Sequence, residues 1–123
     1  MLKTNSKAAR QNIRQYIMNH SEYLTEVYEA TTEKQIIASI AQAYKDEYLT
    51  AHTPMTQKHF TEWASGLTCG DLFDFFDFGT VSAVDTLGEI LQESEEERNR
   101  YTEQQAAECF AYLIYREVLK AIS

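Results

Sequence analysis

Three regularly spaced carboxylates stand out among the residues that could do chemistry. Asp71, Asp74 and Asp77 recur at every third position among large apolar side chains in the segment 71–78. On a short helix this spacing places the three carboxylates along one flank, while the apolar residues between them face the core. The anchoring side chains are then Phe73, Phe76 and either Leu72 or Phe75. We therefore predict an acidic display that is held in place by buried aromatic rings.

A catalytic or calcium-binding role for these carboxylates is disfavoured by their surroundings. A calcium loop needs ligands at alternate positions, a glycine at the sixth and a glutamate at the twelfth, and this segment has none of that pattern. General acid and base catalysis by Asp74 and Asp77 would require a pocket that shifts their pKa values, which no sequence feature indicates. We expect a surface feature and not an active site.

A second pattern, His59-x-x-Glu62, places an imidazole and a carboxylate one helical turn apart. It could supply two ligands of a metal-dependent enzyme, with His52 nearby in the sequence, but two ligands do not make a metal site. The ordinary interpretation is polar residues flanking an apolar anchor, Phe60 and Trp63. Nucleotide-binding glycine motifs, serine hydrolase elbows, paired CxxC motifs and HExxH are absent. The sequence predicts no enzyme, no cofactor and no metal.

The charge distribution suggests a partner. The net charge is −8, and residues 71–108, here called the acidic zone, hold eleven carboxylates against two arginines, a balance of −9. Such a surface favours the basic surface of a protein partner and disfavours nucleic acid. A solvated face without a partner remains the simpler alternative. The predicted partner-binding residues are Asp71, Asp74, Asp77, Glu89, Glu93, Glu95, Glu96 and Glu97.

Two rival functions remain open. Lys3, Lys7, Arg10 and Arg14 give residues 1–20 a charge of +4 and cluster on one side of a helix, so they could contact a nucleic-acid backbone. Four cations offset a net charge of −8 poorly, and we expect them to be solvated or paired with the protein's own acids. The other rival is a structural homodimer in which the last helix buries an apolar face against its twin.

The elements that must position these residues are helical. With 44% hydrophobic residues, four glycines and one proline, the 123-residue chain is typical of an all-α, compact single-domain bundle of five to seven helices over 1–123. Apolar periodicity and capping residues predict helices over 6–20, 21–29, 32–49, 56–65, 71–78, 82–91 and 94–122. The predicted core contains Ile36, Ile37, Ile40, Trp63, Phe73, Phe76, Leu87, Phe110 and Leu113.

The compartment follows from what the sequence lacks. No apolar run is long enough for a membrane span, and the polar, basic N-terminus does not look like a secretory signal, so we expect a cytoplasmic protein. Cys69 and Cys109 lack metal-type spacing and are expected to be reduced thiols, with a single disulfide as the alternative.

Three segments resemble small uncharacterised proteins of phages and conjugative mobile genetic elements. They are the opening Leu2–Lys7 leading into an isoleucine-containing helix, the Trp-x-x-Gly-Leu helix end within Phe60–Leu67, and the acidic-to-apolar segment Tyr101–Ile122. The resemblance carries no catalytic residues over to this chain. It implies an accessory protein, and small acidic proteins in that setting include anti-CRISPR inhibitors. A nucleic-acid mimic that occupies the cationic groove of a host defence enzyme is the most specific form of this hypothesis.

Overall fold

The computed structural model describes residues 6–47, 54–66 and 73–123, and this part of the chain is helical without a β-strand. Seven α-helices and one short 3-10 turn confirm the predicted all-α class. They are α1 (Lys7–Asn19), α2 (Glu22–Tyr28), α3 (Glu33–Glu47), α4 (Gln57–Gly66), η1 (Asp74–Phe76), α5 (Ala83–Leu91), α6 (Glu95–Arg98) and α7 (Glu103–Ile122).

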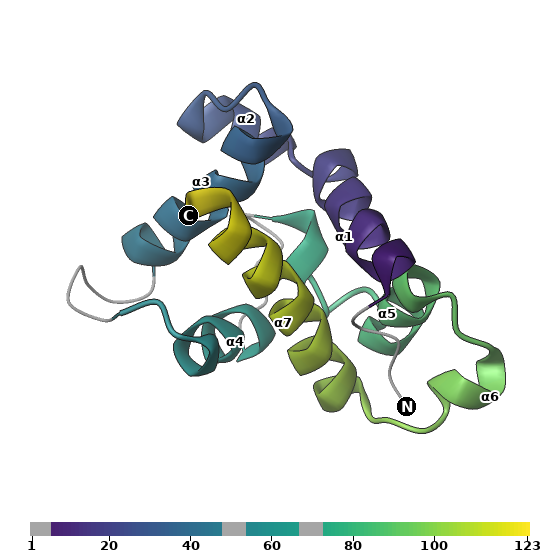
Figure 1. Ribbon diagram of the computed structural model, residues 1–123. Helices are drawn as coiled ribbons and strands as arrows, with labels where there is room; N and C mark the ends of the chain where they lie inside the picture. Colours follow the sequence, from purple (N-terminus) through teal and green to yellow (C-terminus); the bar gives the residue numbers. More distant parts are fainter. Residues whose placement is uncertain (1–5, 48–53, 67–72) are drawn as a thin grey trace.

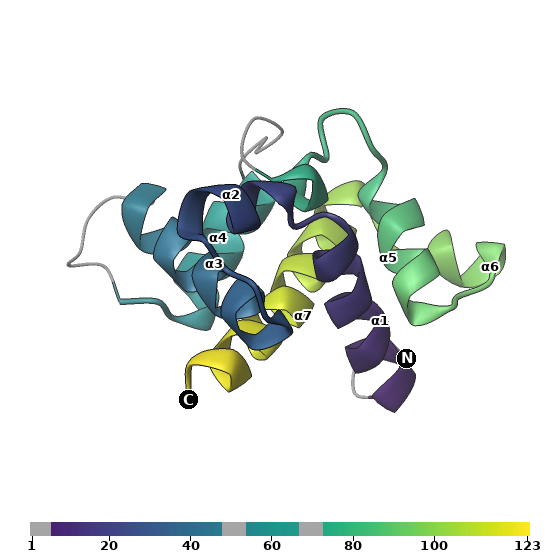
Figure 2. The ribbon, with the colours of Figure 1, turned by 90° about the horizontal axis from the view of Figure 1, so that it is seen from above.

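The last helix, α7, lies in the middle of the bundle (Figure 1). It packs against α1, α3, α4 and α5, while α2 packs on α3 and α6 packs on α5. Figures 1 and 2 together show α2 and α6 well apart, with α1 and α5 side by side between α7 and α6. None of the described helices is long and apolar enough to cross a bilayer.

Capping residues set the starts of several helices where the sequence predicts them. The Ser6 hydroxyl accepts a hydrogen bond from the Ala9 amide at the start of α1, and Ser82 does the same for Asp85 in α5. At the start of α3, the Gln35 amide donates to the Thr32 hydroxyl and the Gln35 side chain accepts from the Thr32 amide. These bonds satisfy amides that have no partner within the helix.

The predicted single helix from Ser94 to Ile122 is wrong, because the chain turns between α6 and α7. A second capping box, in which Thr102 and Gln105 exchange hydrogen bonds, starts a new helix at that point. The short α6 folds back onto α5, where the Arg98 side chain crosses Gly88 so closely that a Cβ there would lie 2.2 Å from the Arg98 Nε. Only a glycine permits that approach.

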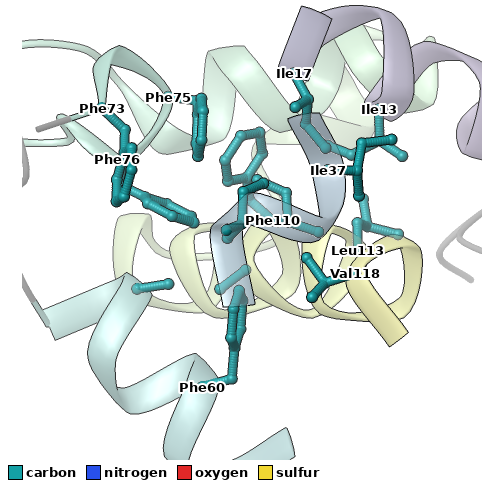
Figure 3. Close-up of a cluster of buried hydrophobic side chains, with 14 of the residues drawn as sticks. Ile13, Ile17, Ile37, Phe60, Phe73, Phe75, Phe76, Phe110, Leu113 and Val118 are labelled. Atoms are coloured by element: carbon teal, nitrogen blue, oxygen red, sulfur yellow. The ribbon is translucent and has the colours of Figure 1, made fainter. Parts of the chain in front are cut away.

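The core is rich in aromatic rings that come from separate parts of the chain. All nine residues predicted for it are buried. Figure 3 shows Phe73, Phe75 and Phe76 beside Phe110, with Phe60 below them and isoleucines from α1 and α3 completing the cluster. Ring centroids of Trp63 and Phe76 lie 5.7 Å apart in an edge-to-face arrangement, which aromatic pairs favour.

The predicted short helix over 71–78 is reduced to the single turn η1 within the described residues. Phe73 precedes it in an extended conformation, with φ −137° and ψ 131°. The rings of Phe73 and Phe75 consequently stack at 5.1 Å, and Phe73, Phe75 and Phe76 are all buried. One stripe of an α-helix could not bury three aromatic residues at this spacing. Asp71 and Leu72 lie outside the described residues.

Candidate functional site

Asp74 of η1 and Glu89 of α5 are the two predicted carboxylates whose charges both act on one aromatic side chain of α1. Asp74 is exposed because its aromatic neighbours are buried, and Glu89 is exposed because the opposite side of α5 faces the core. Both act on the phenol of Tyr16 in α1, whose pKa is raised by burial first, then by Glu89 and then by Asp74. The two carboxylates, far apart in the sequence, therefore share one aromatic neighbour.

A small cavity of about 180 Å³ accompanies this arrangement. Tyr16 and Glu89 both line it, together with polar side chains of α1. The Asn12 side chain donates a hydrogen bond of 2.9 Å to the Ile90 carbonyl, which ties α1 to α5 at the same point. The Tyr16 ring stacks on His20 at 4.2 Å and meets the edge of Phe110, so its position is held by packing. The surface around Tyr16 is thus built on a rigid support.

Helix α6 adds two further exposed carboxylates, Glu95 and Glu96, at one end of the molecule (Figure 2). Glu97 has a different role, because its side chain accepts a hydrogen bond from the Ser94 amide in the capping box of α6. Glu97 belongs to the predicted partner-binding set, and within the fold its side chain caps α6.

The prediction that Glu93 belongs to the exposed acidic surface is wrong. Gln92 ends α5 in a left-handed conformation, with φ 56°, and the Glu93 amide bonds back to the Gly88 carbonyl at 2.8 Å. This tight turn leaves Glu93 only 8% exposed. Its carboxylate lies near Cys109, whose pKa is raised to about 11 by burial first and by Glu93 second. Cys109 is a free thiol and stays protonated at neutral pH.

Other members of the acidic zone also serve the fold. Asp77 is half-buried and accepts a hydrogen bond from the Thr80 hydroxyl at 2.8 Å. Glu103 of α7 caps α5, accepting bonds from the Ser82 hydroxyl at 2.6 Å and the Ala83 amide at 2.7 Å. The Ser82 hydroxyl is the main cause that lowers the pKa of Glu103. The exposed display is therefore smaller than the predicted set and consists of Asp74, Glu89, Glu95 and Glu96.

This four-carboxylate set, which we call the acidic surface, has two parts, Asp74 and Glu89, which act on Tyr16, and Glu95 and Glu96 on α6. Within residues 6–47, 54–66 and 73–123, no lysine or arginine forms an ion pair with any of its members. Asp85 is also exposed, but its carboxylate lies 3.9 Å from the Arg98 guanidinium. Sequence reasoning missed Tyr16 as part of this surface. It sits beside the apolar stripe of α1, and nothing local indicates that Asp74 and Glu89 approach it.

The rival basic face is partly neutralised inside the molecule. Arg14 contacts the carboxylate of Glu117 in α7 at 3.0 Å, and Arg10 contacts the other oxygen at 3.6 Å. Arg14 also lies 3.6 Å from Glu33 of α3. Lys7 is exposed, and Lys3 lies outside the described residues. The expected pairing with the protein's own acids does occur, although its acceptors lie outside the acidic zone.

The geometry gives little support to the two remaining alternatives, a structural homodimer and a metal-dependent enzyme. The apolar face of α7 is covered by other helices of the same chain, and its exposed large apolar residues are Leu119 and Ile122 near its end. His59 Nδ1 lies 3.1 Å from the Pro54 carbonyl oxygen. In the portion of the chain that the structure describes, no three metal-ligating side chains come together. His52 and Cys69 are outside that portion.

Comparison with known proteins adds no family to this picture. No protein-family model matches the chain, and no match was found among curated proteins or among solved structures. The functional inference therefore depends on the fold and the surfaces described above.

Proposed function

We propose that this protein is a non-catalytic binding module that docks the basic surface of another protein. The acidic surface, Asp74, Glu89, Glu95 and Glu96, would make the contact. The observation that carries the proposal is that Asp74 and Glu89 are both exposed, both act on the packed side chain of Tyr16, and form no ion pair with a lysine or arginine of the described residues. A lysine or arginine from a partner would supply the missing charge there.

The physical support comes from both charge and shape. Exposed carboxylates attract a cationic surface over roughly 8–10 Å at physiological salt, and the net charge of −8 adds to this attraction. Single exposed ion pairs contribute little, so affinity needs several of them together with a contact that excludes water. Tyr16 and the small cavity beside it provide such a contact. An aromatic ring flanked by two carboxylates suits an ammonium or guanidinium group.

The most specific form of the proposal is inhibition of a nucleic-acid-binding enzyme. A groove that accommodates phosphates is positively charged, and it is therefore complementary to the acidic surface. The sequence resemblance to proteins of phages and mobile elements favours a host defence enzyme as the target, as in anti-CRISPR proteins, and thereby a cytoplasmic location. This step is an analogy, and it depends on the docking proposal.

Direct nucleic-acid binding through α1 receives less support. Arg10 and Arg14 both contact the buried Glu117, and Arg14 also contacts Glu33, so two carboxylates already offset their two positive charges. A phosphate backbone would have to compete with those carboxylates while approaching a molecule of net charge −8. Salt-dependent retention on duplex DNA that is lost when Lys7, Arg10 and Arg14 are neutralised would reverse this preference.

Affinity purification from the native host with a charge-matched pair of variants tests the proposal. The first variant, Asp74→Asn/Glu89→Gln/Glu96→Gln, removes three carboxylates of the acidic surface. The second, Glu22→Gln/Glu26→Gln/Glu29→Gln, removes three exposed carboxylates at α2, which lies well apart from α6 (Figure 1) and whose carboxylates are not among those that raise the pKa of Tyr16. Both change the net charge from −8 to −5, since each loses three negative charges.

We expect the wild type and the α2 variant to retain the same partner at physiological salt, and the acidic-surface variant to lose it. The captured protein should carry a basic surface, and its binding, measured by calorimetry with purified components, should weaken as salt is raised. Equal recovery by all three proteins would overturn the proposal. Equal loss in both variants would show that only net charge matters.

A further inference from the structure

A second cavity, distinct from the acidic surface, lies between α1, α3 and α7. Its volume is about 300 Å³, and its charged lining comes from all three helices. Ile37 of α3 and Ala121 of α7 provide an apolar part. The basic residues at its edge are Arg14, Lys34 and Lys120. This volume lies at the lower end of the range of about 300–1,000 Å³ that is typical of sites for small organic molecules. Five of its seven lining residues are charged, so a ligand with a charged group suits it.

Arg14 is held in place before any ligand arrives. Its Nη1 atom lies 3.0 Å from Glu117 Oε1, and its Nε atom lies 3.6 Å from Glu33 Oε1. Glu117 is only 2% exposed, and Arg10 contacts its second oxygen at 3.6 Å. Because two carboxylates hold the guanidinium, Arg14 forms a fixed part of the cavity wall and leaves the binding of a ligand to other side chains.

Lys34 and Lys120 are the cations that this cluster leaves uncompensated. Both are exposed, and neither forms an ion pair with a residue in the described ranges. Lys34 lies in the first turn of α3, where the helix dipole disfavours a positive charge. The cluster holds four cations, Arg10, Arg14, Lys34 and Lys120, and two carboxylates, Glu33 and Glu117, so two positive charges are in excess.

We propose that this cavity binds a small organic carboxylate that carries a hydrocarbon group. The carboxylate would lie between Lys34 and Lys120, where it offsets the excess charge, and the hydrocarbon group would cover Ile37 and Ala121. Glu33 and Glu117 do not oppose this arrangement strongly, because the two arginines already compensate them. The proposal is independent of the docking function, because none of the residues of the acidic surface lines this cavity.

Benzoate is a suitable probe, with benzamide and benzylammonium as neutral and cationic analogues of similar shape. In a titration followed by methyl NMR, benzoate should shift the Ile37 and Ala121 signals saturably, with a Kd of about 1 mM or lower. The two analogues should bind at least about tenfold more weakly, because benzamide carries no negative charge to pair with the lysines and benzylammonium is repelled by them. Equal binding by benzamide, or no saturable shift with benzoate, would overturn the proposal.

A lysine pair elsewhere on the protein provides the matched control. Lys34→Gln/Lys120→Gln should weaken benzoate binding about tenfold, while Lys45→Gln/Lys58→Gln, which removes two other exposed lysines, should leave it unchanged. All four lysines are exposed, so both variants should keep the fold, and circular dichroism verifies this. Equal weakening by the two pairs would mean a general charge effect and no site.

Discussion

Two charged regions lie on different sides of helix α1, and they differ in whether their carboxylates are exposed or buried. Around Tyr16, Asp74 and Glu89 are exposed and have no cation among the described residues. Around Arg14, the Glu117 carboxylate is almost fully buried and contacts two arginines. A buried charge must be compensated within the fold, since removing it from water is costly, whereas an exposed one can await a partner.

The difference teaches that the number of charges in a segment does not reveal their role. Within the acidic zone, Glu93 is buried, and Glu97 and Glu103 cap helices. Only some of the remaining carboxylates are exposed. Substitutions that affect either the stability of the fold or only the exposed charges can test this distinction between structural and exposed carboxylates.

The largest effect should come from the aromatic support of the display. Phe76→Ala should lower the free energy of unfolding by about 3–5 kcal/mol, because it leaves a cavity in the aromatic core. Asp74→Asn, two residues away on the exposed side, should change it by less than about 0.5 kcal/mol. Urea denaturation followed by circular dichroism measures both. Similar losses for the two variants would mean that Asp74 is structural and not displayed.

The buried ion cluster should give the next largest effect. Arg10→Met/Arg14→Met leaves the Glu117 carboxylate buried without its cations and should cost about 3 kcal/mol. Adding Glu117→Met should restore most of the loss, because no buried charge then remains. Lys7→Met, at an exposed position on the same helix, is the control. A triple variant less stable than the double variant would contradict this account.

A smaller, pH-dependent effect should follow from the cap of α5. Glu103→Gln removes the charged acceptor of the Ser82 and Ala83 bonds and should cost about 1 kcal/mol at pH 7. The folded state lowers the pKa of Glu103 below its ordinary 4.5, so this stabilisation is present above that value and is lost as the pH falls through the folded pKa. The stabilities of the wild type and the variant should therefore converge once the pH has fallen below the folded-state pKa of Glu103.

Denaturation curves recorded across this pH range test the prediction, with Glu108→Gln on the same helix as the control for a solvated carboxylate. A difference between wild type and Glu103→Gln that persists unchanged in acid would mean that the charge of Glu103 does not contribute.

The smallest effect should be on the Tyr16 phenol. Asp74→Asn/Glu89→Gln should lower the pKa of Tyr16 towards its ordinary value of 10, while burial keeps it somewhat above that value. A carbon-13 NMR titration of labelled tyrosines detects this change without requiring any partner. Glu22→Gln/Glu26→Gln should leave the midpoint in place. An unchanged Tyr16 midpoint in the first variant would show that the two carboxylates do not converge as described.

Much of the secondary structure could be predicted because its causes are local. Helix stripes such as Ile36, Ile37 and Ile40 follow from periodicity, and the caps at Ser6, Thr32, Ser82 and Ser94 follow from residue type and spacing. The break before α7 was missed although it has a local signal, the capping box of Thr102 and Gln105.

The candidate surface could be predicted only in part. The exposure of Asp74 followed from the aromatic residues around it, but the burial of Glu93 depends on a left-handed residue, Gln92, and on the approach of α7. The single turn found in place of the predicted helix likewise buries Phe73, Phe75 and Phe76 together, which depends on the tertiary core around them. Neither outcome is encoded in the spacing of charges along the chain.

The sequence by itself determined the helical class, most helix starts, the core residues and the concentration of negative charge in one stretch, because these depend on neighbours within a turn or two. Only the tertiary structure decided which charges are displayed and which are bound. Arg14 and Glu117 are separated by 103 positions, and their contact depends on how α1 packs against α7. Burial and Coulomb interaction depend on distance in space, and packing brings together residues that the order of the chain keeps apart.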